Sequence, residues 1–202
     1  MGEPVIIVTG TPGAGKTSIS LILSGLFSCT YVDSSEAFRA AGATVSDPTG
    51  RYTEVIDEDR ARGVVVGTVA RARGCVVVDT VYPSIWMEYL EEYTALIVLV
   101  RCNPRELCKR LYSRGWPTGK VLENCEAEAV GSIAWEVSPW SHMVIEVDTT
   151  GRSPGESVDL ALDKLYSWST GIYIDWLSID EGVVEYLSRL PRIDPNKYRG
   201  PQ

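Results

Sequence analysis

The sequence predicts an α/β fold in which five parallel strands form a sheet flanked by helices. Strand-like runs alternate with helical stretches, an order typical of parallel sheets. The runs at residues 5–8, 75–78 and 96–100 are nearly continuous in β-branched and aliphatic residues, as in strands covered on both faces. We expect strands at about 5–9, 30–33, 75–79, 96–100 and 143–147, and helices at about 16–27, 35–41, 57–73, 104–114, 118–136 and 155–168.

A complete Gly-x-x-x-x-Gly-Lys-Thr motif occupies residues 10–17, between the first expected strand and the first expected helix. This motif holds a phosphate only where a strand turns sharply into a helix, and that context is present. Its glycines let backbone N–H groups and the helix N-terminus converge on the phosphate. Lys16 is then expected to reach the β and γ phosphates, and the Thr17 hydroxyl is suited to ligate magnesium. The sequence therefore predicts a nucleotide-binding loop.

The composition is that of an ordinary globular chain. Its 202 residues suffice for one domain with a substantial core, and 45% apolar and 23% charged residues carry no signature of disorder. No apolar run approaches the ~20 residues of a membrane helix, and no basic leader precedes the first strand, so we expect a cytoplasmic protein without a membrane partner. The net charge of −8 disfavours a broad nucleic-acid surface, and no direct nucleic-acid binding is expected.

The five cysteines, at positions 29, 75, 102, 108 and 125, show no Cys-x-x-Cys spacing. A zinc site is therefore not expected. Free buried thiols are the default expectation for an odd number of cysteines in such a chain, and a disulfide is plausible mainly in a hyperthermophile.

Two stretches interrupt the alternation of strands and helices. Residues 34–57 are polar and carry turn signals at Gly42, Asp47-Pro48 and Thr49-Gly50. Residues 114–120, Arg-Gly-Trp-Pro-Thr-Gly-Lys, form a short link between two expected helices. Inserts at the carboxyl edge of a parallel sheet commonly cover a ligand, although both stretches are also compatible with ordinary loops.

Three charged residues outside the loop are candidates for phosphate chemistry. Asp79 closes a buried strand, where a carboxylate can hold magnesium through a water; the alternative is an N-cap or loop aspartate. Arg110 and Arg114 are four residues apart and project from one helix face. Paired arginines stabilise a moving phosphoryl group, while the alternative is a solvated basic face shared with Arg105 and Lys109.

The remaining signals are weaker. Arg39, in the polar insert, is a candidate for gripping an acceptor phosphate. The acidic residues at 57–59 open the next helix, which dipole complementation alone also explains. His142 is expected to be a structural or surface residue, and the six tryptophans are expected to anchor the core and the lid.

Five segments together resemble the isoenzyme-six branch of the adenylate kinases, a family linked to small-ribosomal-subunit maturation. They are Gly-Thr-Pro-Gly-Ala-Gly-Lys-Thr-Ser at 10–18, Tyr-Thr-Glu-Val-Ile-Asp-Glu-Asp-Arg at 52–60, Val-Val-Val-Asp at 76–79, Arg-Leu-Tyr-Ser-Arg-Gly-Trp at 110–116 and Asn-Cys-Glu-Ala-Glu at 124–128. The match runs from the N-terminus to about residue 168. The loop is shared with many unrelated NTPases, whereas the other segments are more specific.

The resemblance implies the P-loop NTPase fold in a single kinase domain at 1–169. A nucleoside-monophosphate insert is expected at about 34–57 and a lid at about 113–123. The implied reaction is ATP + AMP ⇌ 2 ADP with Mg²⁺, and other monophosphates are alternative acceptors. The implied residues are Gly13, Ala14, Gly15, Lys16, Thr17 and Ser18 on the ATP phosphates, Arg110 and Arg114 at the lid, Arg152 near the adenine, Asp33, Arg39 and Asp59 at the monophosphate, and Thr17 and Asp79 at the metal.

Two features depart from the family pattern. The family usually has Asp-x-His after the third strand, and the histidine is associated with ATP hydrolysis; here the sequence is Asp79-Thr80-Val81. Metal binding and phosphoryl transfer remain expected, while hydrolysis is left open. Residues 170–202 extend past the resemblance as a C-terminal extension of unknown role, with a helix expected at about 179–190 and a proline-rich tail.

Three functional hypotheses follow. The first is a magnesium-dependent nucleoside monophosphate kinase. The second is a nucleotide-switched assembly factor with an ATPase role that docks on a small-subunit ribosomal protein, since an acidic chain suits a basic partner. The third is another small-molecule P-loop kinase, such as a shikimate or cytidylate kinase, whose acceptor-site arginine patterns differ. The preferred monophosphate and the oligomeric state stay open.

Overall fold

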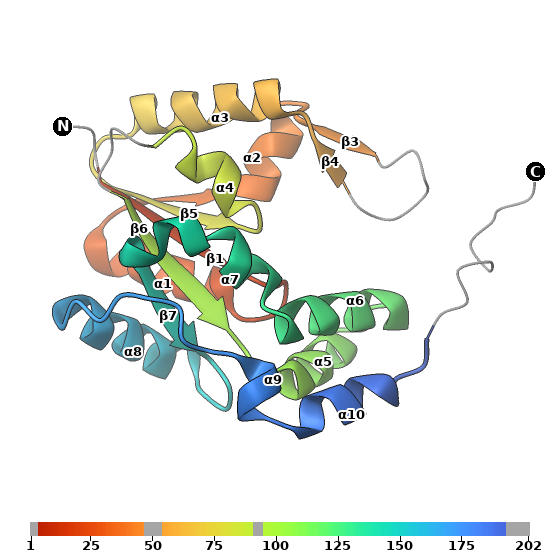
Figure 1. The fold of residues 1–202 in the computed structure, drawn as a ribbon. Helices are drawn as coiled ribbons and strands as arrows, with labels where there is room; N and C mark the ends of the chain where they lie inside the picture. Colours follow the sequence, from red (N-terminus) through yellow and green to blue (C-terminus); the bar gives the residue numbers. More distant parts are fainter. Residues whose placement is uncertain (1–3, 47–53, 91–94, 193–202) are drawn as a thin grey trace, which may run out of the picture.

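A computed structural model describes residues 4–46, 54–90 and 95–192, and it confirms the predicted fold class. Five parallel strands form one sheet in the order β2-β5-β1-β6-β7 (Figure 1). The predicted strands agree with the observed ones to within a residue or two. The strands are β1 (Val5–Gly10), β2 (Thr30–Asp33), β5 (Val76–Thr80), β6 (Ala95–Arg101) and β7 (Val144–Asp148).

Alternate residues of the strands enter two separate cores, one on each face of the sheet. Val8, Val77 and Val98 pack on the face covered by the helices α1 (Lys16–Phe27), α5 (Pro104–Ser113), α6 (Thr118–Ala129) and α8 (Pro154–Tyr166). Their strand neighbours Ile7 and Val78 pack on the opposite face, together with Leu99. That face is covered by α2 (Ser34–Ala40), α3 (Glu58–Arg71), α4 (Pro83–Met87) and α7 (Ser132–Glu136).

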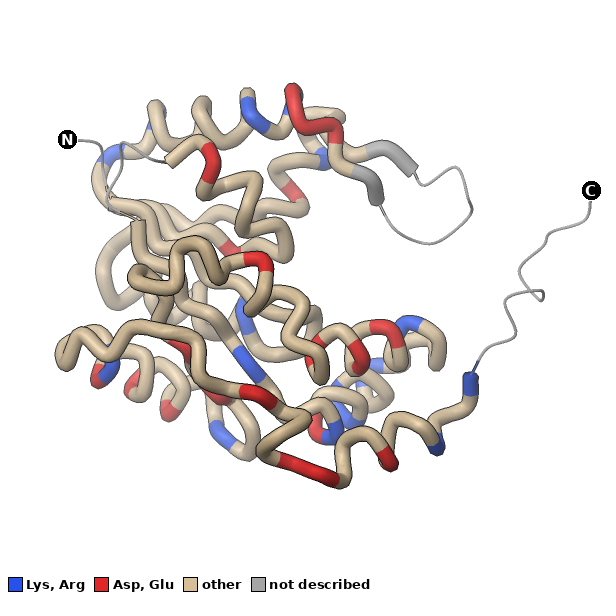
Figure 2. The backbone as a smooth tube through the Cα atoms, in the orientation of Figure 1, with Lys and Arg blue, Asp and Glu red and all other residues tan. Residues whose placement is uncertain are grey.

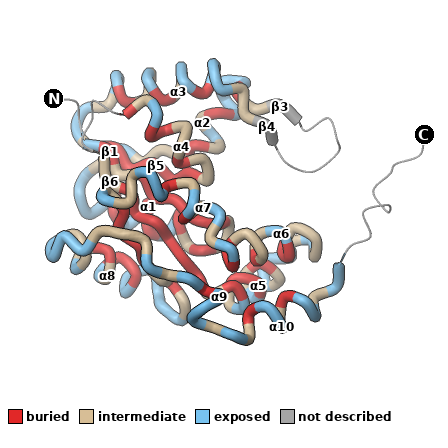
Figure 3. The backbone as a smooth tube through the Cα atoms, in the orientation of Figure 1, coloured by how far each residue is buried: buried red, intermediate tan, exposed pale blue. Residues whose placement is uncertain are grey.

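Burial on both faces explains the near-continuous apolar runs of the sequence. In Figure 3 the buried positions follow the strands and the inner sides of the helices, while the outer sides of α3 and α8 are exposed. Among the helices of the described part of the chain, none is both long and apolar enough to span a bilayer.

The prediction of one long helix at 118–136 is wrong, because two helices occupy this range. The range divides into α6 and α7 because Gly131 adopts a left-handed φ of 66°, which ends one helix and caps the next. The helix expected at about 179–190 is observed as the shorter α10 (Gly182–Ser188), and a separate short helix, α9 (Trp176–Ile179), precedes it. Sequence analysis also missed α4 and the 3₁₀ helix η1 (Ser138–Met143), both of which begin with proline in the first turn.

The polar insert contains α2 followed by a two-stranded antiparallel hairpin, β3 (Thr44–Ser46) and β4 (Glu54–Ile56). The turn signals at Asp47-Pro48 and Thr49-Gly50 lie outside the described residues, as does the proline-rich end of the chain. The short link predicted as a lid joins the end of α5 to the start of α6.

The expectation of free thiols is wrong for four of the five cysteines. A disulfide joins Cys29 to Cys75, with Cα atoms 4.7 Å apart, and a second joins Cys108 on α5 to Cys125 on α6, with Cα atoms 5.9 Å apart. Both separations suit a disulfide, whereas the positions along the sequence carried no sign of this proximity. Cys102 stays free, and burial raises the pKa of its thiol to about 12.

The prediction that the tryptophans anchor the core and the lid is wrong for two of them. Trp86 and Trp176 are buried as expected, but Trp135 and Trp168 are 81% and 76% exposed and cannot anchor the core. His142 is exposed, as expected for a surface residue.

The segment after residue 169 packs on the sheet rather than leaving it. The backbone N–H of Gly171 donates to the carbonyl of Val144 at 2.8 Å and extends the edge beside β7. Further along, Val183 and Leu187 of α10 are buried in the core that contains α5 and α6. Figure 1 shows α9 and α10 lying beside α5.

Candidate nucleotide-binding site

The Gly-x-x-x-x-Gly-Lys-Thr segment forms a closed loop between β1 and α1, as the motif predicts. Two of its positions admit only glycine. At Gly10, with φ of 143°, an added Cβ would lie 2.1 Å from the carbonyl oxygen of Val100. At Gly13, with φ of 91°, it would lie 2.7 Å from a methyl group of Leu111. The close approach of the loop to β6 and α5 therefore fixes the loop's path.

Lys16 opens α1 and lies inside the loop. Its side chain is only 8% exposed, and Nζ lies 3.5 Å from the carbonyl oxygen of Thr11. Burial lowers the pKa of Lys16 below its ordinary value, and the carboxylates of Asp79 and Glu128 oppose that shift. An enclosed ammonium group of this kind is stabilised by a nearby anion, and a phosphate is the anion that such a loop accommodates.

Thr17 and Asp79 meet beside the loop, although 62 positions separate them in the sequence. The Thr17 hydroxyl donates to Oδ2 of Asp79 at 2.5 Å. A hydroxyl and a carboxylate are hard oxygen donors, so this pair fits the few protein ligands that magnesium takes at phosphates. The pairing favours the metal-site interpretation of Asp79 over an N-cap, and Asp79 lies within β5 rather than at a helix start.

Arg110 lies against the loop. Its guanidinium donates to the carbonyl oxygens of Ala14 at 3.3 Å and Thr149 at 2.7 Å, and it pairs with Glu106 at 3.1 Å. Thr149, which directly follows β7, donates its own hydroxyl to the Ala14 carbonyl at 2.7 Å. These contacts favour a role for Arg110 at the loop over a solvated basic face.

A cavity of about 310 Å³ opens next to these groups. It brings together several residues that the sequence placed at the ATP site, from three separate segments of the chain. Arg152, in the loop after β7, is held at the cavity by a hydrogen bond to the carbonyl of Asp148 at 2.8 Å. The predicted residues that line it are Ala14, Gly15, Ser18, Arg110, Arg114 and Arg152.

The three residues predicted for the monophosphate belong to α2, its N-cap and α3, and these two helices cover the sheet face opposite α1 and α5. Asp33 ends β2 and caps α2, accepting from the N–H of Glu36 at 2.9 Å, and its charge acts on Lys16. Arg39 is exposed in the last turn of α2, and Asp59 is exposed in the first turn of α3. Their joint role remains a prediction.

Sequence reasoning missed several residues that the site uses. Thr149 follows the end of a buried strand, the same position that singled out Asp79. Tyr31 lies with its hydroxyl 3.5 Å from Asp79, and burial together with that carboxylate raises the pKa of Tyr31 to about 12. Glu128 contacts the loop through Thr11, and only the resemblance had drawn attention to its segment.

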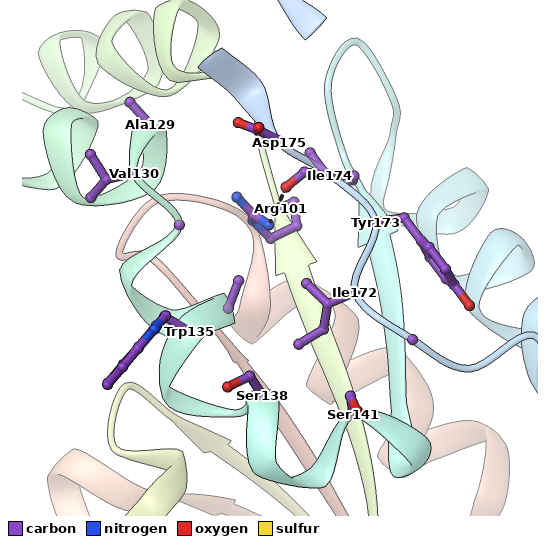
Figure 4. Close-up of a pocket in the computed structure, with 13 residues that line it drawn as sticks. Arg101, Ala129, Val130, Trp135, Ser138, Ser141, Ile172, Tyr173, Ile174 and Asp175 are labelled. Atoms are coloured by element: carbon purple, nitrogen blue, oxygen red, sulfur yellow. Dashed lines mark hydrogen bonds between the residues drawn. The ribbon is translucent and has the colours of Figure 1, made fainter. Parts of the chain in front are cut away.

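A larger cavity, of about 580 Å³, lies away from the phosphate loop. It is bounded by α7 and by the segment at 171–175 (Figure 4). The guanidinium of Arg101 at its floor is bonded to the carbonyl of Ile174, while Trp135 points away from it. Because none of the phosphate-loop residues lines this cavity, the smaller one is the candidate nucleotide site despite its size.

Comparisons with known proteins identify the family of this chain. A family model described as an AAA domain matches residues 6–131, which include the phosphate loop, Asp79 and the arginines of α5. A protein of Saccharolobus islandicus named "Putative adenylate kinase" is 34% identical over 190 residues, covering 94% of this chain and 95% of the relative. The chain belongs to the adenylate kinase-like family of P-loop proteins.

Another member of this family, a protein of the same name from Thermococcus onnurineus, is 36% identical over 91% of this chain and 97% of its own length. Alignments of this coverage extend into the segment after residue 169. Among solved structures, a gluconokinase from Sinorhizobium meliloti and a shikimate kinase from Acinetobacter baumannii superpose with TM-scores of 0.55 and 0.54. Each covers 82% of this chain and is itself covered to 92%; at 17% and 22% identity they show the shared fold alone.

We predict that Gly13→Ala abolishes ATP binding while the protein still folds. The added methyl group meets Leu111 at 2.7 Å in a backbone conformation that disfavours any side chain, so the loop must move. Gly25→Ala is the matched control, because Gly25 is helical and a Cβ there meets nothing within 4 Å. Calorimetric titration with ATP should give no binding for the first variant and wild-type affinity for the second. Wild-type affinity of Gly13→Ala would contradict the account.

Proposed function

We propose that this protein is a nucleoside monophosphate kinase of the adenylate kinase type, which transfers the γ-phosphoryl group of ATP to AMP. The observation that carries the proposal is the enclosed Lys16 beside the Thr17–Asp79 pair, next to a cavity lined by arginines. This arrangement would supply positive charge and metal ligands close to the phosphates of a bound nucleotide. Those are the elements that phosphoryl transfer requires.

In the proposed reaction an oxygen of the monophosphate attacks the γ-phosphorus, and the bond from that phosphorus to the β–γ bridging oxygen breaks. Lys16, Arg110 and Arg114 stabilise the charge on the transferred group and on the leaving ADP. Thr17 and Asp79 would hold magnesium, which supplies further charge neutralisation. No side chain is needed as a base, because positioning and electrostatics provide most of the catalysis in this reaction.

The acceptor site is proposed on the opposite side of the loop, at the elements α2 and α3. Arg39 would grip the monophosphate, and Asp33 and Asp59 would contribute polar contacts. The likeness to the isoenzyme-six branch supports AMP as the acceptor and leaves room for other monophosphates. The absence of a histidine in Asp79-Thr80-Val81 favours transfer over hydrolysis of ATP.

We predict that Lys16→Ala reduces kcat by about 10²–10³-fold, because it removes the cation next to the transferred phosphoryl group. The measurement is a coupled assay of ADP formation from ATP with AMP, dAMP, CMP, UMP or GMP, with ATP alone as the hydrolysis control. Lys109→Ala, an exposed lysine of α5, is the matched control and should retain activity. Failure of the wild-type protein to form ADP with any monophosphate would contradict the kinase proposal, and turnover of ATP alone would favour an ATPase.

We predict that Arg39→Met raises the KM for the monophosphate by at least about tenfold, since it removes a cation that pairs with phosphate. The KM for ATP should stay unchanged. Arg71→Met, which removes an exposed arginine at the far end of α3, serves as the control. An equal rise in both KM values would place Arg39 outside the acceptor site.

A second role, in maturation of the small ribosomal subunit, is favoured by charge and by one surface feature. The chain has a net charge of −8, which attracts basic proteins. Figure 2 shows acidic residues spread over most elements, while basic residues gather around α5. Trp135 and Val130 are 81% and 67% exposed beside the larger cavity, and exposed tryptophans are frequent at protein interfaces.

We predict that a tagged protein recovers a small-subunit ribosomal protein from a native lysate of its source organism, and that Trp135→Ala weakens this recovery at least about tenfold. Kinase activity should be unaffected by this change, because Trp135 is remote from the loop. Trp168→Ala, which alters another exposed tryptophan, is the control. If no ribosomal protein is recovered, the protein serves nucleotide metabolism alone.

A further inference from the structure

Glu128, on α6, is a buried carboxylate whose two oxygens have different partners. The side chain is only 2% exposed. Oε1 accepts hydrogen bonds from Arg101 Nε at 2.8 Å, from the backbone N–H of Cys102 at 3.2 Å and from Trp176 Nε1 at 2.9 Å. Oε2 accepts the hydroxyl of Thr11 at 2.5 Å. Oε1 is thus bound to the end of β6 and to Trp176 of α9, whereas Oε2 is bound to the phosphate loop.

Thr11 is the second residue of the loop, and its carbonyl oxygen organises the loop's interior. That oxygen accepts the N–H of Ala14 at 3.1 Å, which closes the turn, and lies 3.5 Å from Lys16 Nζ. Thr11 itself is 2% exposed, so its side chain has little freedom to rotate. The hydrogen bond to Glu128 therefore fixes the position of Thr11. The carbonyl oxygen of Thr11 in turn positions the turn at Ala14 and the side chain of Lys16.

We propose that Glu128 is a positioning residue for ATP, which holds the phosphate loop in its binding conformation through the Thr11 hydroxyl. It acts through its hydrogen bond to Thr11, in addition to the charge by which it raises the pKa of Lys16. The proposal rests on the proposed ATP site, but it does not depend on which monophosphate accepts the phosphoryl group. A preformed loop binds its ligand without the cost of ordering the loop at that moment.

Glu146 is a matched control residue: it stabilises the fold as Glu128 does, but among the described residues it has no contact that could position the phosphate loop. It is also buried and also pairs with Arg101, with Oε1 2.7 Å from Nη1. Its other oxygen accepts the backbone N–H groups of Tyr173 and Ile174, at 2.6 and 2.9 Å. No contact of Glu146 in the described chain reaches the loop. The two carboxylates therefore share a cation and differ in what their second oxygen holds.

The test measures the Kd of a non-hydrolysable ATP analogue with magnesium by calorimetry, alongside Tm. Glu128→Gln is expected to raise the Kd about tenfold, the effect of losing a hydrogen bond to a charged group. Glu146→Gln is expected to lower Tm as much as Glu128→Gln does and to leave the Kd unchanged. Thr11→Val should match the Kd of Glu128→Gln, and Thr11→Ser, which keeps the hydroxyl, should recover most of that loss.

The double variant Thr11→Val/Glu128→Gln supports the proposal if it binds the analogue no more weakly than either single variant. In that case both substitutions act by removing the same hydrogen bond, the one between Thr11 and Glu128. Fully additive losses would overturn the proposal, as would an equal rise in Kd for Glu146→Gln. If Glu128→Gln does not fold, the Thr11→Val and Thr11→Ser pair decides: equal affinities overturn the proposal. Because analogue binding needs no acceptor, an absent kinase activity does not affect the result. Failure of the wild-type protein to bind the analogue refutes the ATP site itself.

Discussion

The rest of the structure depends on the buried ion pairs that Arg101 forms with Glu128 and Glu146. Arg101 lies at the end of β6 and is 1% exposed. Two carboxylates neutralise it, Glu128 from α6 and Glu146 from β7, and the carbonyl of Ile174 accepts a further hydrogen bond. A charge so far from water must be fully paired, and removing one partner of a buried pair costs about 3–5 kcal/mol. The positions of α6, β7 and the C-terminal segment are therefore set together.

This constraint reaches the phosphate loop from two directions. Glu128 holds the Thr11 hydroxyl, and the hydroxyl oxygen of Thr149 lies within hydrogen-bond distance of the carbonyl oxygens of both Ala14, at 2.7 Å, and Arg101, at 3.0 Å. The loop is consequently fixed by parts of the chain more than 100 residues away. The C-terminal segment takes part as well, since Trp176 donates to the same carboxylate oxygen as Arg101. The segment after residue 169, which the sequence analysis left without a role, therefore contacts the carboxylate that holds the phosphate loop.

The parts predicted well from sequence are those encoded by local patterns. The β-branched runs defined the buried strands, and the glycine motif defined the loop, because a strand-to-helix turn around phosphate has few solutions. The failures concern non-local contacts. Nothing in the sequence indicated that Cys108 would meet Cys125 or that Arg101 would meet Glu128. Gly131 was visible, but a lone glycine is tolerated within helices, and only its observed left-handed conformation shows that it ends one.

The central claim is that this loop, held in place by the buried ion-pair network, binds the triphosphate of ATP around Lys16. A crystal structure with a non-hydrolysable ATP analogue, magnesium and AMP tests it most directly. The account predicts phosphate oxygens at Lys16 Nζ, with the bond from Thr11 to Glu128 intact. An empty loop, or Lys16 directed away from the phosphates, would contradict it.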